Sequence, residues 1–468
     1  MEVLQRTANR GSIATGGYDI ANSLKFESDN AEYLYYTSST QTDYKRMAFS
    51  VWLKRTELST SQRIAEFGNG TSNTSNLRIG FDTSDRLFCY GNSIIFRQTN
   101  QVFRDTSAWY HLFFQFDTTQ STSNDRIKIW VNGSMIAHTD FGVIDNPSSG
   151  AAMGFNNGLQ QSIGAQREDG PTGYFNGYMA QVYGSGGTPP SVTDFGEFDE
   201  DTGIWKPIDI SELTPPDTQG FNLDFSDASN LGNDISTRNN NFTLQNITSA
   251  DQAVDTPTNS FCTINAINLS TQTLTEGATK VFSSDNSART AYGTIAPSSG
   301  KWWWEGKIQV FESSDAYPCI GVTTNLAGLP STSAQLSGGH CIKLAKAQKW
   351  VLNDTGYSYG TAYADNDIIN VGLDLDNKKF YTYKNGTIDD ANGIDISSTT
   401  FDGFGSQWMP LVIVYGSGGA SGYEMNFGGF ANYTISSGES DANGYGTFEY
   451  APPSGYYAIC TKNLAEYG

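Results

Sequence analysis

The sequence predicts an all-β protein of two β-sandwich domains joined by an irregular connector. Short runs that alternate apolar and polar residues, such as "MAFSVWLKRT" and "LRIGFDT", recur along the chain, and clusters of Asn, Gly, Ser and Thr separate them. Only 16% of the residues are charged and 13% are aromatic, which suits pleated strands joined by polar turns. No stretch sustains a helical period over three turns, and 468 residues are too many for one core.

Changes in composition divide the chain into four segments. Residues 1–17 are polar and Gly-rich, and we expect them to form an extended arm. Residues 18–187 hold the first set of strands and residues 261–468 hold the second. Residues 188–260 contain adjacent prolines, an acidic run and isolated apolar islands. We therefore expect an irregular connector there that adds a strand or two to a neighbouring sheet.

Three pieces of the first set follow one another in a characteristic order. The strand "WYHLFFQFD" comes first, and "DRIKIWVNGSMIA" then forms a hairpin whose Asn132 and Gly133 supply a type I′ turn. The strand in "GYFNGYMAQVYGSG" closes the set. In this order the pieces resemble the laminin-G/pentraxin branch of the concanavalin A-like jelly rolls. The resemblance covers residues 18–187 and implies a jelly roll.

Six pieces of the second set also occur in a recognisable order. They are "GKWWWEGKI", "CIGVTTN", "NDIINVGLDLD", "KKFYTYKNG", "QWMPL" and "YEMNFGG". Together they resemble the SPRY (B30.2-like) β-sandwich, which implies that fold for residues 261–468. Asn366 stands where the family usually has Gly, and the turn can still form because Asn tolerates a left-handed conformation.

The three consecutive tryptophans Trp302, Trp303 and Trp304 raise the question of an exposed binding platform. In a strand, Trp302 and Trp304 face one way and Trp303 faces the other. Three exposed indoles would leave a large apolar area in water. We therefore expect a strand that is covered on both faces, and not a platform for a sugar or a base.

Composition excludes several classes of function. The net charge is −21 and the pI is about 4.4, so the chain repels phosphate backbones and we expect no nucleic-acid partner. The five cysteines form no C-x-x-C pair, and their wide spacing suits thiols of a reducing cytosol, with a Cys319–Cys341 disulfide as the alternative. The N-terminus has no apolar signal region, and no apolar run is long enough to span a membrane.

We expect no enzymatic activity. The chain has only three histidines and contains no G-x-S-x-G, H-E-x-x-H or P-loop motif. In "GEFDEDTG", Glu197 and Asp199 match the first two acids of the E-x-D-x-E motif of laminarinase-type glucanases, and Asp201 takes the third position. This stretch follows the last strand of the jelly roll and does not lie on its concave strand. A solvated loop does not hold the paired carboxyls that glycoside hydrolysis needs, so we expect a turn or a loop that binds a divalent ion.

No cofactor is expected other than a structural Ca²⁺, and the metal ligands are unknown. The laminin-G resemblance implies that such an ion would lie at the rim of the jelly roll, held by Asp, Asn and backbone oxygens. Asp117, Asp125 and Asp140 are candidates, but the spacing assigns no ligand set and no EF-hand is present.

The candidate ligand-binding residues lie in predicted loops that combine Gly, Ser and Asn with Tyr, a mixture that is typical of binding surfaces. These loops span residues 69–76, 151–169, 325–339, 354–363 and 415–423. The candidates are Asn69, Asn73, Asn76, Asn156, Asn157, Arg167, Asp354, Tyr357, Tyr359, Tyr415 and Tyr423. For each loop, a plain solvated turn is the alternative.

Two further stretches, "FGEFDEDTGIWKP" and "PPSGYYAICTKNLAE", resemble segments of marine tailed-bacteriophage structural proteins that combine a jelly roll with a SPRY-like end. This resemblance implies a virion surface protein, such as a tail fibre or receptor-binding adhesin, that is made in the host cytoplasm and exposed on the particle. It implies a host surface glycan or outer-membrane protein as partner. Other virion proteins would bind the arm, and the chain would form a homo-oligomer such as a trimer.

Three alternatives remain open at this point. The first is a capsid decoration protein without a receptor role. The second is a laminarinase-like enzyme that acts on glycan. The third is a cellular adhesin or a SPRY-type adaptor for other proteins, although the chain has neither the heptads nor the zinc-ligand spacing that usually precede SPRY in such adaptors.

Overall fold

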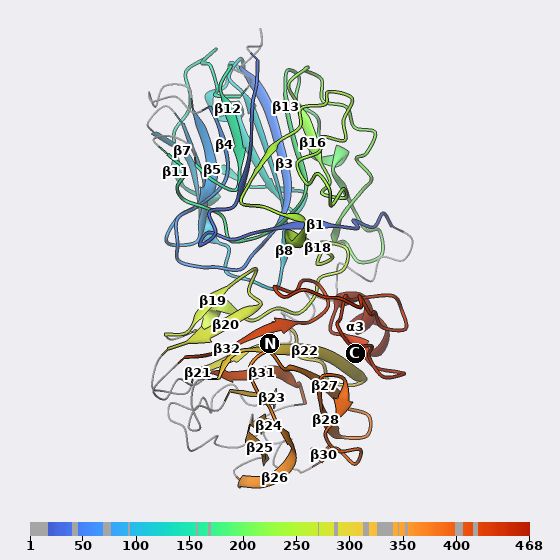
Figure 1. The fold of residues 1–468 in the computed structure, drawn as a ribbon. Helices are drawn as coiled ribbons and strands as arrows, with labels where there is room; N and C mark the ends of the chain where they lie inside the picture. The colour runs from blue at the N-terminus through green and yellow to red at the C-terminus, as the bar shows by residue number, and fades with distance from the viewer. Residues whose placement is uncertain are drawn as a thin grey trace. The chain divides into compact units, whose positions relative to one another are not determined.

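The structure is a computed structural model. It describes residues 17–39, 45–68, 76–91, 94–155, 158–166, 170–269, 271–284, 289–311, 318–324, 340–344, 346–351, 354–397, 406–414 and 420–468. The chain forms two compact units, and the division between them falls between Thr258 and Asn259 (Figure 1). Each unit is built from β-sheets, so the predicted all-β class is confirmed.

Two large antiparallel sheets and the small sheet of β14 (Gly196–Phe198) and β15 (Trp205–Pro207) form the first unit. Sheet A has the order β10 (Ser134–Met135), β9 (Ile127–Val131), β8 (Trp109–Asp117), β3 (Arg46–Arg55), β13 (Gly177–Gly186), β1 (Ser23–Phe26) and β18 (Gln252–Ala253), and β16 (Phe221–Leu223) also pairs with β13. Sheet B has the order β11 (Phe141–Ile144), β7 (Ile94–Val102), β6 (Arg86–Gly91), β5 (Leu77–Phe81), β4 (Gln62–Phe67), β12 (Gln160–Ile163), β2 (Tyr33–Thr37) and β17 (Thr243–Gln245).

The core of the first unit lies between these two sheets. Every second residue of a strand faces it, as in Phe49 and Val51 of β3 and Ile79 and Phe81 of β5, and all four are fully buried. The predicted hairpin turn joins β9 to β10: Asn132 has a φ of 47° and Gly133 a φ of 73°, as a type I′ turn requires.

The irregular segment after β13 packs onto the first unit. Its strands β16, β17 and β18 extend sheets A and B by pairing with β13, β2 and β1. Its hairpin, β14 (Gly196–Phe198) and β15 (Trp205–Pro207), brings apolar residues to the outer face of sheet A. By these contacts residues 188–258 belong to the first compact unit.

The second unit also contains two sheets. Sheet C has the order β19 (Thr273–Thr275), β20 (Lys280–Ser283), β32 (Ser421–Asn426), β22 (Lys301–Phe311), β27 (Ile368–Asp374), β28 (Lys379–Lys384) and β29 (Thr387–Ile388), while β30 (Ile394–Asp395) pairs with β28 and β33 (Tyr457–Ala458) with β22. Sheet D has the order β21 (Arg289–Tyr292), β31 (Met409–Val414), β23 (Cys319–Thr323), β24 (His340–Leu344), β25 (Lys346–Val351) and β26 (Asp354–Ala362).

Helices are short throughout the described part of the chain. The 3₁₀ helices are η1 (Ser123–Arg126), η2 (His138–Asp140), η3 (Val192–Asp194), η4 (Ser249–Asp251) and η5 (Ala266–Asn268), and α3 (Thr461–Tyr467) ends the chain. No helix among the described residues is long and apolar enough to cross a membrane.

The tryptophan strand is covered on both faces, as predicted. Trp302 and Trp304 lie in the core between sheets C and D, and Trp303 on the opposite face is only 1% exposed. The ring of Trp303 meets Tyr383 edge-on at 5.0 Å, and the backbone of β33 runs parallel to β22 beside it. These indoles are therefore structural.

The cysteine thiols of the described residues are also structural. Cys89, Cys262, Cys319 and Cys460 are buried thiols that form no disulfide. Burial raises the pKa of the Cys89 and Cys460 thiols to about 12, so both are protonated and unreactive. Because Cys319 forms no disulfide, the alternative of a Cys319–Cys341 disulfide is wrong.

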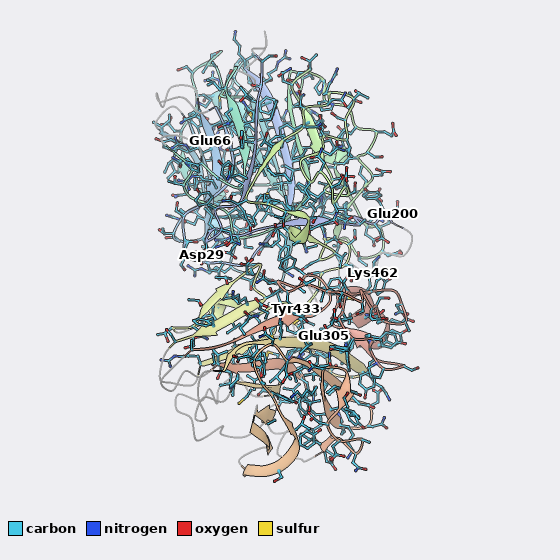
Figure 2. All side chains as sticks on the ribbon, in the orientation of Figure 1. Asp29, Glu66, Glu200, Glu305, Tyr433 and Lys462 are labelled. Atoms are coloured by element: carbon cyan, nitrogen blue, oxygen red, sulfur yellow. The ribbon has the colours of Figure 1, made fainter. Side chains whose placement is uncertain are left out.

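A buried carboxylate anchors the C-terminal segment to sheet C. Glu305 of β22 is fully buried, and it lies beside Tyr433 in Figure 2. It accepts hydrogen bonds of 2.9–3.2 Å from the side chains of Asn370, Asn426 and Tyr433 and from the backbone N–H groups of Glu449 and Tyr450. Burial raises the pKa of Glu305 to about 7, against the opposing effect of these donors.

Replacing Glu305 by glutamine is expected to destabilise the second unit. The amide N–H₂ would face at least two buried donors, so we expect the free energy of unfolding to fall by roughly 2–4 kcal/mol. Guanidinium unfolding of the full chain, followed by tryptophan fluorescence, measures this change. The exposed Glu439→Gln is the matched control, and equal stability of both variants would contradict the anchor role.

Candidate functional site

The acidic stretch that resembles a glucanase motif forms the β14–β15 hairpin. The Glu197 side chain is 59% exposed and lies 3.2 Å from the ammonium group of Lys206. Asp199 also pairs with Lys206, and hydrogen bonds from Thr202 hold the pKa of its carboxyl below the usual value. Glu200, labelled in Figure 2, is exposed in the same turn. These carboxylates are solvated or paired with Lys206, and they do not form the acid–base pair that glycoside hydrolysis needs.

Ser50 and His111 also form a hydrogen bond, but the donor and the acceptor are reversed relative to a catalytic serine–histidine pair. The Oγ of Ser50 lies 2.8 Å from Nε2 of His111, and the indole N–H of Trp205 donates to Nδ1 of His111 at 3.0 Å. Because Nδ1 accepts, the neutral ring carries its proton on Nε2 and donates it to Ser50. Burial lowers the pKa of His111 to about 3. This imidazole therefore cannot act as the base that activates Ser50.

His111 and Ser50 lie under an aromatic cap, which we define as Val192, Phe195, Trp205 and Ile210 on the outer face of sheet A. The ring of Trp205 stacks on His111 at a centroid distance of 5.8 Å, and Phe195 packs against Phe113 at 5.3 Å. A side chain at Gly133 would collide with Trp205, since its Cβ would lie 2.1 Å from the indole. The cap therefore covers His111 and Ser50 on this face.

The outer face of sheet B carries a different set of side chains. Five directly opposed residues form a row across five strands: Tyr35, Ser162, Glu66, Arg78 and Tyr90. Directly opposed residues of an antiparallel sheet point to the same side. Their neighbours along each strand, Leu34, Ile163, Ala65, Ile79 and Cys89, face the core. The row therefore faces away from the core, and we call it the outer row.

A second pair of residues completes an arginine–aromatic patch. Arg63 is opposed by Gly80, which is in turn opposed by Phe88. Because Gly80 has no side chain, Arg63 reaches across it and its guanidinium carbon lies 4.9 Å from the centre of the Phe88 ring. The outer row, Arg63 and Phe88 together make up the patch.

The guanidinium group of Arg78 also lies over an aromatic ring, that of Tyr90. Its guanidinium carbon lies 5.2 Å from the centre of the Tyr90 ring, and its Nε donates to Glu66 at 2.8 Å. Flat rings and planar guanidinium groups on rigid strands can stack on a sugar and bind its hydroxyl groups. Tyr35, Tyr90 and Arg63 are each partly exposed, whereas the other four residues of the patch, Ser162, Glu66, Arg78 and Phe88, are buried. The exposed part of the patch is the candidate binding site.

The predicted loop residues are distributed differently. Asn69, Asn73, Asn156, Asn157, Arg167 and Tyr415 lie outside the described residues. Asn76 is described and is only 2% exposed, directly before β5. It is therefore not on a solvated loop tip, and that part of the prediction is wrong.

The predicted loops of the second unit need a similar correction. Tyr423 lies within β32 and Tyr359 within β26, and alternation along each strand directs both rings into the core. Asp354 and Tyr357 are also strand residues of β26, where a loop was expected. The Gly–Tyr–Ser composition of these stretches resembles that of a loop, but strand pairing determined their structure.

Sequence reasoning missed the patch, although a signal was present. In "QRIAEF", "LRIGF" and "RLFCYG", arginines, Glu66 and Tyr90 occupy positions next to core-facing residues. The alternation assigns them to the outer face of their own strands. Only the register between strands shows that they form one row.

No metal site appears at the calcium candidates. The Asp117 carboxylate accepts hydrogen bonds from Thr119 and Gln120, and Asp125 pairs with Lys128 at 3.3 Å. Asp140 ends η2. Within the described part of the chain, no three His, Cys, Asp or Glu side chains gather as a metal-binding group. A structural Ca²⁺ therefore remains a prediction.

Comparison with known proteins agrees with the architecture of the first unit. Residues 28–185 match the family described as the concanavalin A-like lectin/glucanases superfamily, of the laminin G type. A search of curated proteins found no match.

Solved structures similar to the chain include two SPRY domains. That of human HERC1 is 13% identical, with a TM-score of 0.29, and the alignment covers 35% of this chain and 96% of that domain. Another human SPRY domain is 12% identical, with a TM-score of 0.27, covering 34% and 96%. These values describe a likeness of fold alone.

The buried imidazole makes the stability of the first unit depend on pH. His111 stays neutral in the fold down to about pH 3, whereas the unfolded chain takes up a proton below about pH 6.5. The contribution of His111 to the free energy of unfolding is constant above pH 6.5, and below that pH it falls by about 1.4 kcal/mol per pH unit. We expect the stability difference between the protein and His111→Gln to shrink as the pH falls from 7 to 4.5.

Chemical unfolding across this pH range measures the difference, with the exposed His138→Gln as control. Nitrogen NMR of the His111 ring gives an independent check, since it should show the Nε2–H tautomer without titration between pH 8 and 5. A His111 ring that titrates near pH 6.5 would contradict the sealed site.

Proposed function

We propose that this chain is a non-catalytic glycan-binding adhesin on the surface of a bacteriophage virion, where it attaches the particle to its host as a tail fibre or receptor-binding protein. The observation that carries the binding role is the arginine–aromatic patch on sheet B. Its partly exposed residues, Tyr35, Tyr90 and Arg63, lie on paired strands, so little conformational entropy is lost when a ligand binds.

Binding is favoured over catalysis by the arrangement of the carboxylates and of the histidine. The hairpin acids pair with Lys206 or face solvent, and His111 donates to Ser50 beneath the aromatic cap. Lectins and glucanases share the superfamily that residues 28–185 match, so the fold alone does not decide between them.

The virion role is supported by the sequence resemblance of "FGEFDEDTGIWKP" and "PPSGYYAICTKNLAE" to marine phage structural proteins. In this proposal the arm at residues 1–17 attaches the chain to other virion proteins. A host glycan is the partner of the patch, and several copies per particle, as in a trimer, raise a weak affinity by avidity.

The non-catalytic role predicts that the hairpin acids are dispensable. The triple variant Glu197→Gln, Asp199→Asn, Asp201→Asn should bind glycans as the parent chain does, and neither protein should release reducing ends from β-glucans. Reducing-sugar assays over long incubation measure this. Hydrolysis by the parent that the triple variant loses would instead support the laminarinase-like alternative.

Attachment is tested by competition. We expect an excess of the purified chain to block adsorption of the phage that carries it to host cells. Cell binding by a multivalent form of the chain is the second readout. Unchanged adsorption together with no cell binding would reject the adhesin role and favour capsid decoration.

A further inference from the structure

We infer that Lys25 and Asp251 of the first unit join in an intramolecular amide bond, with Glu32 as the catalytic acid and base. The inference is carried by the contact of one buried amine with two carboxyl groups. The bond ties strand β1 to the residue directly before β18, so the connector can no longer separate from sheet A. It does not depend on the ligand of the proposed adhesin.

The three side chains meet in a site that is nearly closed to water. The Nζ atom of Lys25 lies 2.8 Å from Oδ1 of Asp251 and 3.0 Å from Oε1 of Glu32. The side chains of Lys25 and Glu32 are 1% and 2% exposed, and that of Asp251 is 11% exposed. The backbone N–H of Glu27 and the side chain of Asn30 donate to Glu32 and fix its position. Groups that the fold already holds in contact lose little further entropy when they react.

Strand pairing brings the amine and the acid together. Leu24 of β1 lies opposite Gln252 of β18, and the next step of this register sets Lys25 opposite Asp251. Leu24 faces the core, so Lys25 points to the outer face of sheet A. Tyr178 lies directly opposite Lys25 in the next strand and is fully buried. Such surroundings disfavour separated charges and favour neutral forms of the groups.

The protons in the site allow the amine to act as a nucleophile. Burial raises the pKa of Glu32 to about 7, against the charge of Lys25 and together with that of Asp251. About half of the molecules therefore carry a proton on Glu32 at pH 7. In these molecules, transfer of one proton from the Lys25 ammonium to Asp251 leaves a neutral amine and two carboxylic acids. The amine is then a nucleophile and the Asp251 acid is an electrophile.

The reaction is a condensation. The neutral amine of Lys25 attacks Cγ of Asp251, and the new Nζ–Cγ bond places negative charge on Oδ2. This oxygen already accepts hydrogen bonds from the backbone N–H of Thr248 at 2.8 Å and from its hydroxyl at 3.2 Å, which stabilise the charge. Glu32 gives its proton to Oδ1, which leaves as water, and takes one proton from Nζ. One amine and one carboxylic acid become one amide and one water, so no oxidant or cofactor is needed.

Mass spectrometry of the intact full chain tests this inference. We expect the purified chain to be lighter than its sequence by the mass of one water, and a protease digest to contain a linked peptide with Lys25 joined to Asp251. The full sequence mass in folded protein, or a link between other residues, would overturn the inference. This measurement uses the unmodified chain and so does not depend on the folding of a variant.

Variants then identify the reacting groups. Lys25→Arg keeps the positive charge but cannot form the amide, and Glu32→Gln keeps the shape of the side chain but cannot transfer the proton. We expect both to have the full sequence mass and to migrate more slowly than the parent in a denaturing gel, because the amide keeps the denatured chain compact.

Lys54→Arg is the matched control, since Lys54 is a buried lysine that pairs with Asp255 at 2.7 Å. This variant should lose one water as the parent does. Loss of water in Lys25→Arg would indicate a dehydration elsewhere in the chain and would overturn the inference. The Lys25–Asp251 link in Glu32→Gln would overturn the catalytic role of Glu32.

Discussion

The organisation of the first unit depends on how the outer face of sheet A is sealed. The segment after β13 folds back over it, and the indole of Trp205 donates to His111 in the centre of the covered face. That bond fixes the tautomer of the imidazole, directs its remaining proton to Ser50 and keeps the ring neutral by burial. A jelly roll has two outer faces, and the cap fills one of them with the chain's own aromatic residues.

Much of the fold could be predicted from the sequence, because strands and turns depend on the local pattern of residues. The alternation of apolar and polar residues predicted the strands. The left-handed conformation of Asn366 (φ 66°) is one that an Asn side chain tolerates. The burial of Trp303 follows from the large apolar area of its indole. The patch could not be predicted this way. It depends on registers such as Glu66 opposite Arg78, which are set by contacts across the whole sheet.

The errors at Tyr359 and Tyr423 have the same origin. Both lie among Gly and Ser residues, a composition that favours turns in isolation. Tyr423 is drawn into a strand by β20 and β22, which are far away along the chain, and Tyr359 by β25, the preceding strand. The amino-acid composition of a segment limits which conformations it can adopt. Pairing with neighbouring strands decides whether the segment becomes an edge strand, a loop or part of the core. Loop-based prediction of binding residues is therefore weakest in sequences like this one, where strands and turns share Gly, Ser, Asn and Tyr.

A site built on strands differs physically from one built on loops. The backbone of Arg63 is fixed by β5 on one side, and Phe88 fixes the plane of its guanidinium, so the group is oriented before any ligand arrives. A loop would have to lose conformational entropy to reach the same geometry.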